Sequence, residues 1–303
     1  MANPSLRPPV DQQDAPTSRN LALGILCMLI AIGGFATMQM FVKLAGPEYP
    51  PFQAVFIRSV IAAVIIVPWM LKSGGTASFK TDCPCGHFFR SLSGVLGNAS
   101  FFYAYSIIAL TEGMAIVMSV PIFVALSAIL FLGEKVGVRR WTAILVGFAG
   151  VMVALNPAGD FQLGSLFALS GTLCWVFSII MIKKLTETES PFLIVFYYMM
   201  TAVVVSGVIV PFIWVTPTMK HALYFFAAGI AGAIGQVLAT YSVKLAPANV
   251  VTPFEYTTIC WGVVFDLTIW GVLPDLHTAI GAGIVIMTGL YIWHRETRVR
   301  AGL

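Results

Sequence analysis

The chain has 303 residues, of which 58% are hydrophobic and only 10% are charged, and its formal net charge is +4. A soluble domain carries about 25% charged residues, so this composition, with a mean hydropathy of +0.90, excludes an ordinary soluble protein. The apolar residues come in blocks of about 20 that do not alternate with period two, which predicts membrane-spanning helices and not the strands of a barrel. The cations lie mainly between these blocks, so the positive charge does not indicate a nucleic-acid partner.

The chain is predicted to be an all-α membrane protein with ten transmembrane helices. Residues 1–19 are polar and proline-rich, and we expect them to form a disordered cytoplasmic tail. The first five spans are predicted at residues 20–43, 52–71, 88–110, 114–132 and 140–155. The second five are predicted at residues 163–183, 191–214, 222–243, 248–271 and 278–293, and residues 295–303 form a second cytoplasmic tail.

The distribution of cations predicts how the chain is oriented. If the N-terminus is cytoplasmic, every Lys and Arg of the 17 in the chain falls in a cytoplasmic segment except Lys43, Lys220 and Arg58. Lys and Arg are enriched on the cytoplasmic side of membrane proteins. We therefore expect a multi-pass protein of the cytoplasmic (inner) membrane with both termini in the cytoplasm.

The two halves of the chain echo each other. Tyr105-Ser106 ends the third predicted span and recurs as Tyr241-Ser242 at the end of the eighth, an offset of 136 residues. Five spans per half is an odd number, so the second half must enter the membrane from the opposite side. We therefore expect two inverted five-helix repeats, over residues 20–157 and 158–294, an arrangement that many secondary transporters share.

The predicted span at residues 248–271 carries two carboxylates. Glu255 and Asp266 are eleven residues apart, close to three turns of an α-helix, so they would share one face. A carboxylate inside a membrane costs about 2.5 kcal/mol or more unless it meets water, a partner or a proton, so this face should line a hydrated space. Glu255 is a candidate for proton coupling or for binding a cationic part of the substrate. The alternative for either residue is a structural acid, which for Asp266 would lie near interfacial water.

Other polar residues within the predicted spans are candidates for the same site. Gln39, Asn98 and Gln236 could bind a substrate through their amides, or they could bridge helices. Arg58 is a candidate for coupling or gating and could hold a substrate carboxylate or phosphate. Alternatively, it could extend to the outer headgroups or pair with an acid, Asp266 or Glu112.

Four aromatic residues and two prolines complete the candidate set. Phe102, Trp175 and Trp261 fall near mid-span and Tyr256 follows Glu255, so these rings could stack on a flat heterocycle or cover a cation. Core packing is the alternative for each ring. Pro121 and Pro253 lie within spans four and nine, where a proline removes a backbone donor and kinks the helix, so both are gating candidates.

The sequence contains no enzyme motif and no phosphate-binding loop for ATP. Cys83, Cys85 and His87 cluster in one predicted loop but lack a fourth ligand, so no metal site is predicted. No cofactor is expected. The lack of an ATP-binding loop leaves proton antiport, exchange or facilitated diffusion as the energy source of any transport.

The chain resembles the ten-span EamA branch of the drug/metabolite transporter superfamily. The resembling residues of the first half are Phe56-Ile57-Arg58, Arg90, Pro121, Leu132-Gly133-Glu134-Lys135, Arg139-Arg140-Trp141, Gly147-Phe148-Ala149-Gly150-Val151 and Asn156-Pro157. Those of the second half are Ala246-Pro247-Ala248, Pro253-Phe254-Glu255-Tyr256, Pro274-Asp275 and Gly289-Leu290-Tyr291. The acid of Gly133-Glu134 has no counterpart at Gly271-Val272, which leaves a symmetric role for it in doubt.

The resemblance implies a secondary transporter that works by alternating access through a central cavity lined by spans one, three, four, six, eight and nine. Its expected partners are a small organic metabolite, such as an amino acid, riboflavin or an S-adenosylmethionine-like cargo, together with protons and membrane lipid. A monomer and a homodimer are both open. The alternatives are a membrane-embedded enzyme, for which the sequence shows no clustered acids or histidines at one membrane face, and a non-transporting scaffold or receptor.

Overall fold

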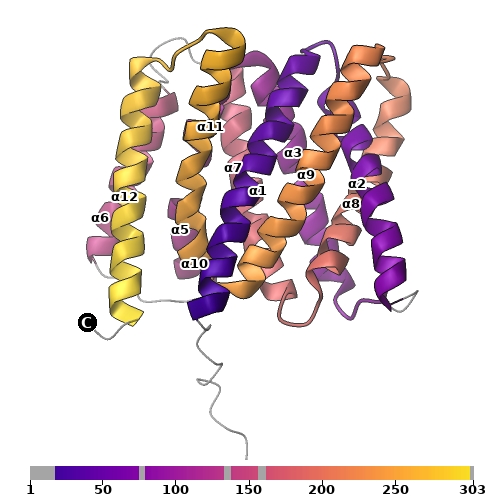
Figure 1. The fold of residues 1–303 in the computed structure, drawn as a ribbon. Coiled ribbons are helices and arrows are strands. Elements are labelled where there is room, and N and C mark those ends of the chain that lie inside the picture. The colour runs from indigo at the N-terminus through magenta and orange to yellow at the C-terminus, as the bar shows by residue number, and fades with distance from the viewer. Residues whose placement is uncertain (1–17, 75–78, 133–137, 156–161, 301–303) are drawn as a thin grey trace, which may run out of the picture.

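The computed structural model describes residues 18–74, 79–132, 138–155 and 162–300, and these residues form helices and no strand (Figure 1). Most of the predicted N-terminal tail, and the Gly133-Glu134 pair, lie outside the described residues. The last helix continues to Arg300, beyond the end of the predicted tenth span.

The first half of the chain forms six helices among the described residues. They are α1 (Ser18–Ala45), α2 (Pro51–Gly74), α3 (Pro84–Ile107), α4 (Leu110–Val117), α5 (Val120–Leu132) and α6 (Val138–Leu155). The second half forms α7 (Leu163–Leu185), α8 (Pro191–Ile209), η3 (Val210–Phe212), α9 (Met219–Leu245), α10 (Ala248–Val251), η4 (Thr252–Thr257), α11 (Thr258–Phe265), η5 (Asp266–Trp270) and α12 (Leu276–Arg300).

Five of these helices are long and apolar enough to cross a membrane. They cover Arg19–Ala45, Pro51–Lys72, Leu163–Leu185, Pro191–Phe212 and Met219–Leu245. Two shorter apolar helical stretches cover Leu110–Val124 and Leu276–Thr288. The protein is therefore a multi-pass helical membrane protein.

Several helices begin where the sequence places a proline or a capping hydroxyl. Proline opens α2, α3 and α8, because the first turn of a helix does not need the missing N–H group. The Ser190 hydroxyl accepts a hydrogen bond from the Leu193 backbone N–H at 3.2 Å at the start of α8. The Thr218 hydroxyl caps α9 in the same way through His221 at 3.4 Å. These caps satisfy backbone donors that the helix itself leaves free.

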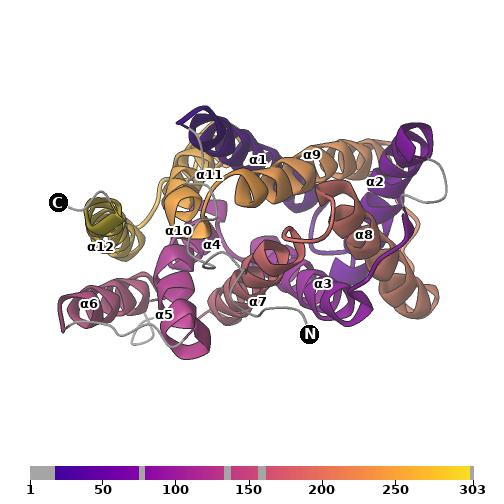
Figure 2. The same cartoon turned by 90° about the horizontal axis from the view of Figure 1, so that it is seen from below.

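The helices pack in pairs that each join the two halves of the chain. The most extensive contacts are between α1 and α9, between α3 and α7, between α6 and α12, and between α2 and α8. Figure 2, which looks along the bundle, shows α1 beside α9 on one side and α7 beside α3 on the other, with α6 and α12 at one end.

The α1–α9 pair depends on glycine. A methyl group added at Gly34 would lie 2.9 Å from the Ala231 carbonyl oxygen and 3.3 Å from the Gly235 backbone. We expect Gly34→Ala to push these helices apart and to destabilise the protein by about 1–3 kcal/mol, the usual effect of overpacking a tight contact. The measurement is the melting temperature of the purified protein in detergent.

The matched control for this prediction is Gly283→Ala in α12, where an added methyl group would meet nothing within 4 Å. Alanine is a better helix former than glycine, so this control should leave stability unchanged or raise it slightly. Equal destabilisation by both substitutions would contradict the close approach at Gly34.

Two predicted spans are broken helices. The fourth is interrupted at Met118 and Ser119, between α4 and α5, and Pro121 lies in the first turn of α5. The predicted continuous helix over residues 248–271 is wrong, because the chain passes through α10, the 3-10 helix η4 that contains Pro253, α11 and the π-helix η5. A proline withholds one backbone donor, and this favours such a change of helix type. Gly271 ends the segment with a left-handed φ of 65°, a conformation that glycine adopts without strain.

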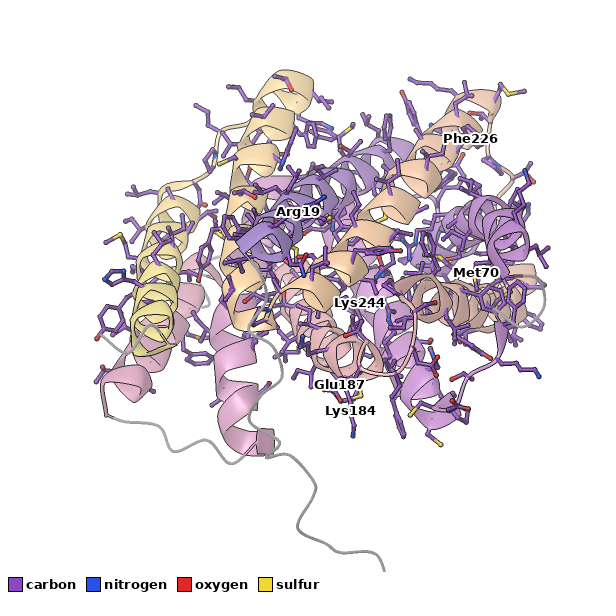
Figure 3. The ribbon with its side chains drawn as sticks, turned by 60° about the horizontal axis from the view of Figure 1, so that its bottom comes forward. Arg19, Met70, Lys184, Glu187, Phe226 and Lys244 are labelled. Carbon is purple, nitrogen blue, oxygen red and sulfur yellow. The ribbon has the colours of Figure 1, made fainter. Side chains whose placement is uncertain are left out.

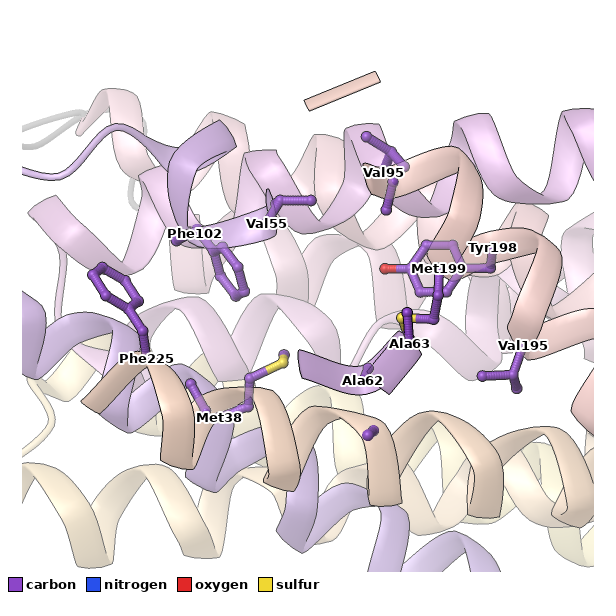
Figure 4. Packing of buried hydrophobic residues seen from close by; sticks show 14 of the residues in the cluster. Met38, Val55, Ala62, Ala63, Val95, Phe102, Val195, Tyr198, Met199 and Phe225 are labelled. Carbon is purple, nitrogen blue, oxygen red and sulfur yellow. The ribbon is translucent and has the colours of Figure 1, made fainter. Parts of the chain in front are cut away.

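The largest apolar core lies among α1, α2, α3, α8 and α9. Figure 4 shows Met38, Val55, Phe102, Tyr198 and Phe225 converging from these helices. All five side chains are buried, and the tyrosine brings a hydroxyl group into an otherwise apolar cluster. This hydroxyl becomes the centre of a polar network that borders the candidate site.

The two ends of the described chain lie at the same side of the bundle. Figure 1 shows α1 beginning and α12 ending at the lower side. Figure 3 brings that side forward and shows Arg19, Lys184 and Lys244 there, at the start of α1 and the ends of α7 and α9.

Candidate functional site

A cavity lies among the helices, and about 650 Å³ of space free of atoms, which includes its opening to solvent, belongs to it. Its walls come from α1, α3, α4, α7, α9, η4 and α11, which belong to the six spans that the family resemblance implies. The polar and charged side chains in its wall are Gln39, Arg90, Ser93, Asn98, Tyr105, Trp175, Ser178, Gln236, Glu255 and Thr258. A cavity with this lining can bind a small molecule that is partly polar and partly aromatic or apolar.

Five of the predicted substrate-binding residues line this cavity. They are Gln39 from α1, Asn98 from α3, Trp175 from α7, Gln236 from α9 and Glu255 from η4. The other three, Phe102, Tyr256 and Trp261, do not belong to its wall.

Glu255 is held in the wall by a tryptophan. Its carboxylate oxygen Oε1 accepts a hydrogen bond from Trp175 Nε1 at 3.0 Å, and the residue is only 4% exposed. The edge of Phe35 packs against the Trp175 ring, with ring centroids 5.6 Å apart, and fixes the position of the indole. The 3-10 helix η4 therefore presents a carboxylate to the cavity at a defined place.

The two glutamines of the cavity each keep a buried atom with no protein partner. Gln39 Oε1 and Gln236 Nε2 have no hydrogen-bond partner within the described part of the chain. A buried amide group without a partner costs free energy, so both atoms are suited to bind a ligand.

Asn98 is different, because its side chain is already engaged. Asn98 Nδ2 donates to the Gly94 carbonyl at 2.9 Å and to the Tyr198 hydroxyl at 2.6 Å. It therefore links α3 to α8 as well as lining the cavity.

The remaining predicted aromatic residues pack elsewhere. Phe102 lies in the apolar core of Figure 4, and Tyr256 packs in a separate cluster that involves α12. Trp261 is 39% exposed, and its ring lies beside Gly33 of α1. The structure therefore places these three rings outside the cavity wall.

Asp266 does not share a face of one continuous helix with Glu255, because two changes of helix type separate them. Its carboxylate accepts hydrogen bonds from the backbone N–H groups of Leu110 at 3.3 Å and Thr111 at 2.7 Å, and from the Thr111 hydroxyl at 2.8 Å. Lys43 Nζ lies 3.8 Å from Asp266 Oδ1, the oxygen that also accepts from Leu110. Asp266 thus caps the start of α4 from a different span, and its side chain is buried within the protein.

Arg58 makes contacts that the sequence did not predict. Its Nη2 donates to the Tyr198 hydroxyl and its Nη1 contacts the Met38 sulfur at 3.2 Å. The predicted pairs with an acid are not formed, since Asp266 pairs with Lys43 and Glu112 accepts a hydrogen bond from Ser165. Arg58 lies behind the cavity wall and not in it.

Arg90 is the charged residue of the cavity wall that was not among the sequence-based candidates; Ser93, Tyr105, Ser178 and Thr258 of the wall were not among them either. Arg90 is fully buried, and Nε, Nη1 and Nη2 have no hydrogen-bond partner within the described residues. Its guanidinium carbon lies 4.2 Å from the centre of the Tyr198 ring. The signal was present in the sequence, because Arg90, Gly94, Asn98, Phe101 and Tyr105 follow one face of α3 at helical spacing.

The cysteine and histidine cluster near the start of α3 does not come together. Cys83 and Cys85 are exposed, whereas His87 is buried with its ring 4.4 Å from that of Tyr197 and its Nε2 3.7 Å from Glu189. Within the described ranges, no group of three or more His, Cys, Asp or Glu side chains could hold a metal ion.

Known proteins are similar to this chain over nearly its whole length. The chain is 28% identical to a riboflavin transporter of Vibrio cholerae over 280 residues, covering 91% of this chain and 94% of that protein. It is 26% identical to an S-adenosylmethionine uptake transporter of Rickettsia bellii, covering 92% and 96% of the two chains. A riboflavin transporter of Rhizobium johnstonii is 29% identical, with 91% and 92% covered.

The fold also has a solved counterpart. A crystal structure matches 88% of this chain and 95% of its own chain with a TM-score of 0.64, at 17% sequence identity. The family model of the EamA-like transporter family matches twice, over residues 22–156 and 162–293. The chain therefore belongs to the EamA-like transporter family.

Proposed function

We propose that this protein is a secondary transporter that moves a small organic metabolite across the cytoplasmic membrane by alternating access. The observation that carries the proposal is the central cavity, whose wall contains Arg90 and Glu255. The Arg90 guanidinium nitrogens, Gln39 Oε1 and Gln236 Nε2 have no hydrogen-bond partner among the described residues. Such groups are costly inside a membrane protein unless they meet a polar partner, water or a ligand, and they often mark the path of a substrate or an ion. Family membership favours this function over a membrane enzyme or a non-transporting scaffold.

The proposal includes two inverted five-helix repeats over residues 20–157 and 158–294. A two-fold axis that exchanged the halves would convert the α1–α9 pair into the α7–α3 pair, and these two pairs make the most extensive contacts. It would also leave the α2–α8 and α6–α12 pairs unchanged, because each joins an element to its counterpart. The double match of the family model divides the chain at nearly the same point.

The broken helices are the proposed moving parts. The break between α4 and α5 precedes Pro121. Pro253 lies in η4, two residues before Glu255. Discontinuous spans at the substrate site are common in secondary transporters, since local changes there open and close the cavity with little loss of helix packing. Both prolines are therefore proposed to act in gating.

The orientation of the protein follows from its charges. Arg19, Lys184 and Lys244 lie at the side of the bundle where α1 begins and α12 ends (Figure 3). Cations are enriched on the cytoplasmic side of the inner membrane. We therefore propose that both termini are cytoplasmic.

The proposed cargo is an amino acid, riboflavin or an S-adenosylmethionine-like metabolite, and the proposed coupling ion is the proton. The names of the relatives support the second and third choices. The indole of Trp175 and the ring of Phe101 in the cavity wall suit the flat ring of such a molecule.

The test is uptake into proteoliposomes that contain the purified protein. Radiolabelled riboflavin, S-adenosylmethionine and a panel of amino acids would be offered with and without a pH gradient. We expect saturable uptake of at least one compound above that of protein-free liposomes. The absence of saturable flux for every compound, in both directions and in exchange mode, would contradict the proposal.

A further inference from the structure

The two buried arginines of the bundle differ in what surrounds them. Arg58 donates to the Tyr198 hydroxyl and contacts the Met38 sulfur. The guanidinium of Arg90 lies over the ring of the same tyrosine, 4.2 Å from its centre, and makes no hydrogen bond within the described residues. Arginine carries five N–H donors and stays charged, so a buried arginine is normally paired with an acceptor.

The surroundings of Arg90 hold its guanidinium in place at the cavity wall. A methyl group added at Gly94 would lie 2.7 Å from Arg90 Nη1 and 2.6 Å from a carbon of the Tyr198 ring. Glycine at this position therefore leaves the space that the guanidinium and the ring occupy together. Tyr198 is itself held by hydrogen bonds to Arg58 and Asn98. The guanidinium is thus preorganised, and no acceptor in the described part of the chain engages its donors.

The charges of the cavity are suited to a ligand with two different ends. Arg90 and Glu255 are the charged residues of its wall, one of each sign. Glu255 accepts a hydrogen bond from Trp175 and can accept another from a ligand donor. A guanidinium binds a carboxylate or a phosphate through two parallel hydrogen bonds, a geometry that lysine does not offer.

We propose that Arg90 is the anion-binding residue of the cavity and that the cargo carries a carboxylate or phosphate group that binds it. The opposite end of the cargo carries an N–H group or a cation that meets Glu255. This inference rests on the proposed transport function and adds the chemical class of the cargo to it. Arg58, which the sequence also offered for this role, has Nη1 and Nη2 engaged by Met38 and Tyr198, and only its Nε is without a partner among the described residues.

Two matched ligand pairs test the proposal on the full-length protein in detergent. S-adenosylmethionine and its decarboxylated form differ by one carboxylate, and riboflavin 5′-phosphate and riboflavin differ by one phosphate. We expect the anionic member of one pair to bind about tenfold or more tightly, because hydrogen bonds to charged groups are the strong ones. The pair that shows the preference identifies the anion as carboxylate or phosphate. Equal binding within both pairs would overturn the inference.

Substitution of Arg90 gives a second, independent measurement. Arg90→Gln should bind both members of the preferred pair equally, whereas Arg19→Gln, at the exposed start of α1, should bind like the unsubstituted protein. A preference that survives Arg90→Gln would contradict the proposal. If this variant does not fold, the ligand pairs on the unsubstituted protein still decide the outcome.

Stability in the absence of ligand separates a binding role from a structural one. Removing an unpaired buried charge relieves its desolvation cost, so Arg90→Met should raise the melting temperature while it abolishes the anion preference. Arg58→Met should lower the melting temperature, because it leaves the Tyr198 hydroxyl without a partner at Arg58. A lower melting temperature for Arg90→Met would indicate that the residue holds α3 to α8.

The transport assay distinguishes failure of this inference from failure of the transport function. Suppose that riboflavin and its phosphate are taken up at equal rates, and that both S-adenosylmethionine forms are as well. The protein would then be a transporter that has no anion-binding site at Arg90. No saturable uptake of any cargo in the panel would remove the transport function and the anion site together.

Discussion

Glu255→Gln is expected to abolish transport driven by a pH gradient and to leave the fold intact. Glutamine has nearly the same size and keeps an oxygen that can accept the hydrogen bond from Trp175 Nε1. It cannot gain or lose a proton in the relevant pH range, so a cycle that moves a proton on this side chain must stop. Accumulation of cargo against its gradient should fall to the level of protein-free liposomes.

Exchange of labelled for unlabelled cargo should continue in the Glu255→Gln protein. Exchange requires the cavity to open to each side of the membrane in turn, but it requires no net movement of protons. Its rate should no longer depend on pH. The matched control is Glu112→Gln, because Glu112 accepts a hydrogen bond from Ser165 outside the cavity wall. If Glu255→Gln still accumulates cargo in response to a pH gradient, proton coupling at this residue is excluded.

Asp266→Ala is expected to cause a large loss of stability, greater than that of Gly34→Ala. Its carboxylate accepts three hydrogen bonds from Leu110 and Thr111 and lies beside Lys43. Alanine would leave two N–H groups at the start of α4 and a largely buried ammonium without this partner. Removing one partner of a buried ion pair costs about 3–5 kcal/mol, so the yield of folded protein and its melting temperature should both fall sharply.

Controls can assign this loss to the carboxylate itself. Asp82→Ala, at an exposed position, should change the free energy of unfolding by less than about 0.5 kcal/mol. Asp266→Ala combined with Lys43→Met should lose less stability than the two single changes together, because no buried cation is left unpaired. Additive losses would show that the ion pair contributes little beyond the cap on α4.

The helical plan of the protein was predictable because it depends on local sequence. Blocks of about 20 apolar residues predict spans, and the predicted starts at residues 52 and 191 lie within one residue of the starts of α2 and α8. The predicted start at residue 88 lies four residues after the start of α3. The same reasoning selected Gln39, Gln236 and Glu255 as candidates, and all three line the cavity. Polar groups avoid lipid, so a polar residue inside an apolar span indicates an interior face even when its neighbours are unknown.

The aromatic and charged residues of the site were less predictable from sequence. A ring stabilises a core as readily as it binds a ligand, and Phe102 and Tyr256 pack in apolar clusters outside the cavity wall. Arg58 and Arg90 are both arginines inside helices, and nothing local distinguishes them. Both guanidinium groups lie near the Tyr198 ring of α8, with their central carbons 5.6 Å and 4.2 Å from its centre. Only the hydrogen bond of Arg58 to the Tyr198 hydroxyl, and the lack of any such bond at Arg90 among the described residues, distinguish them.

The sequence by itself therefore determined that this chain is a multi-pass helical membrane protein with polar groups inside it, because hydrophobic periodicity and the cost of burying charge act residue by residue. Only the tertiary structure decided which of those groups share a cavity. The succession of helix types over residues 248–270 sets the directions of Glu255 and Asp266. Helical spacing counted along one regular α-helix therefore could not predict where the two carboxylates lie. Contacts between residues as distant as Asp266 and Thr111 arise from the packing of spans, which no local pattern specifies.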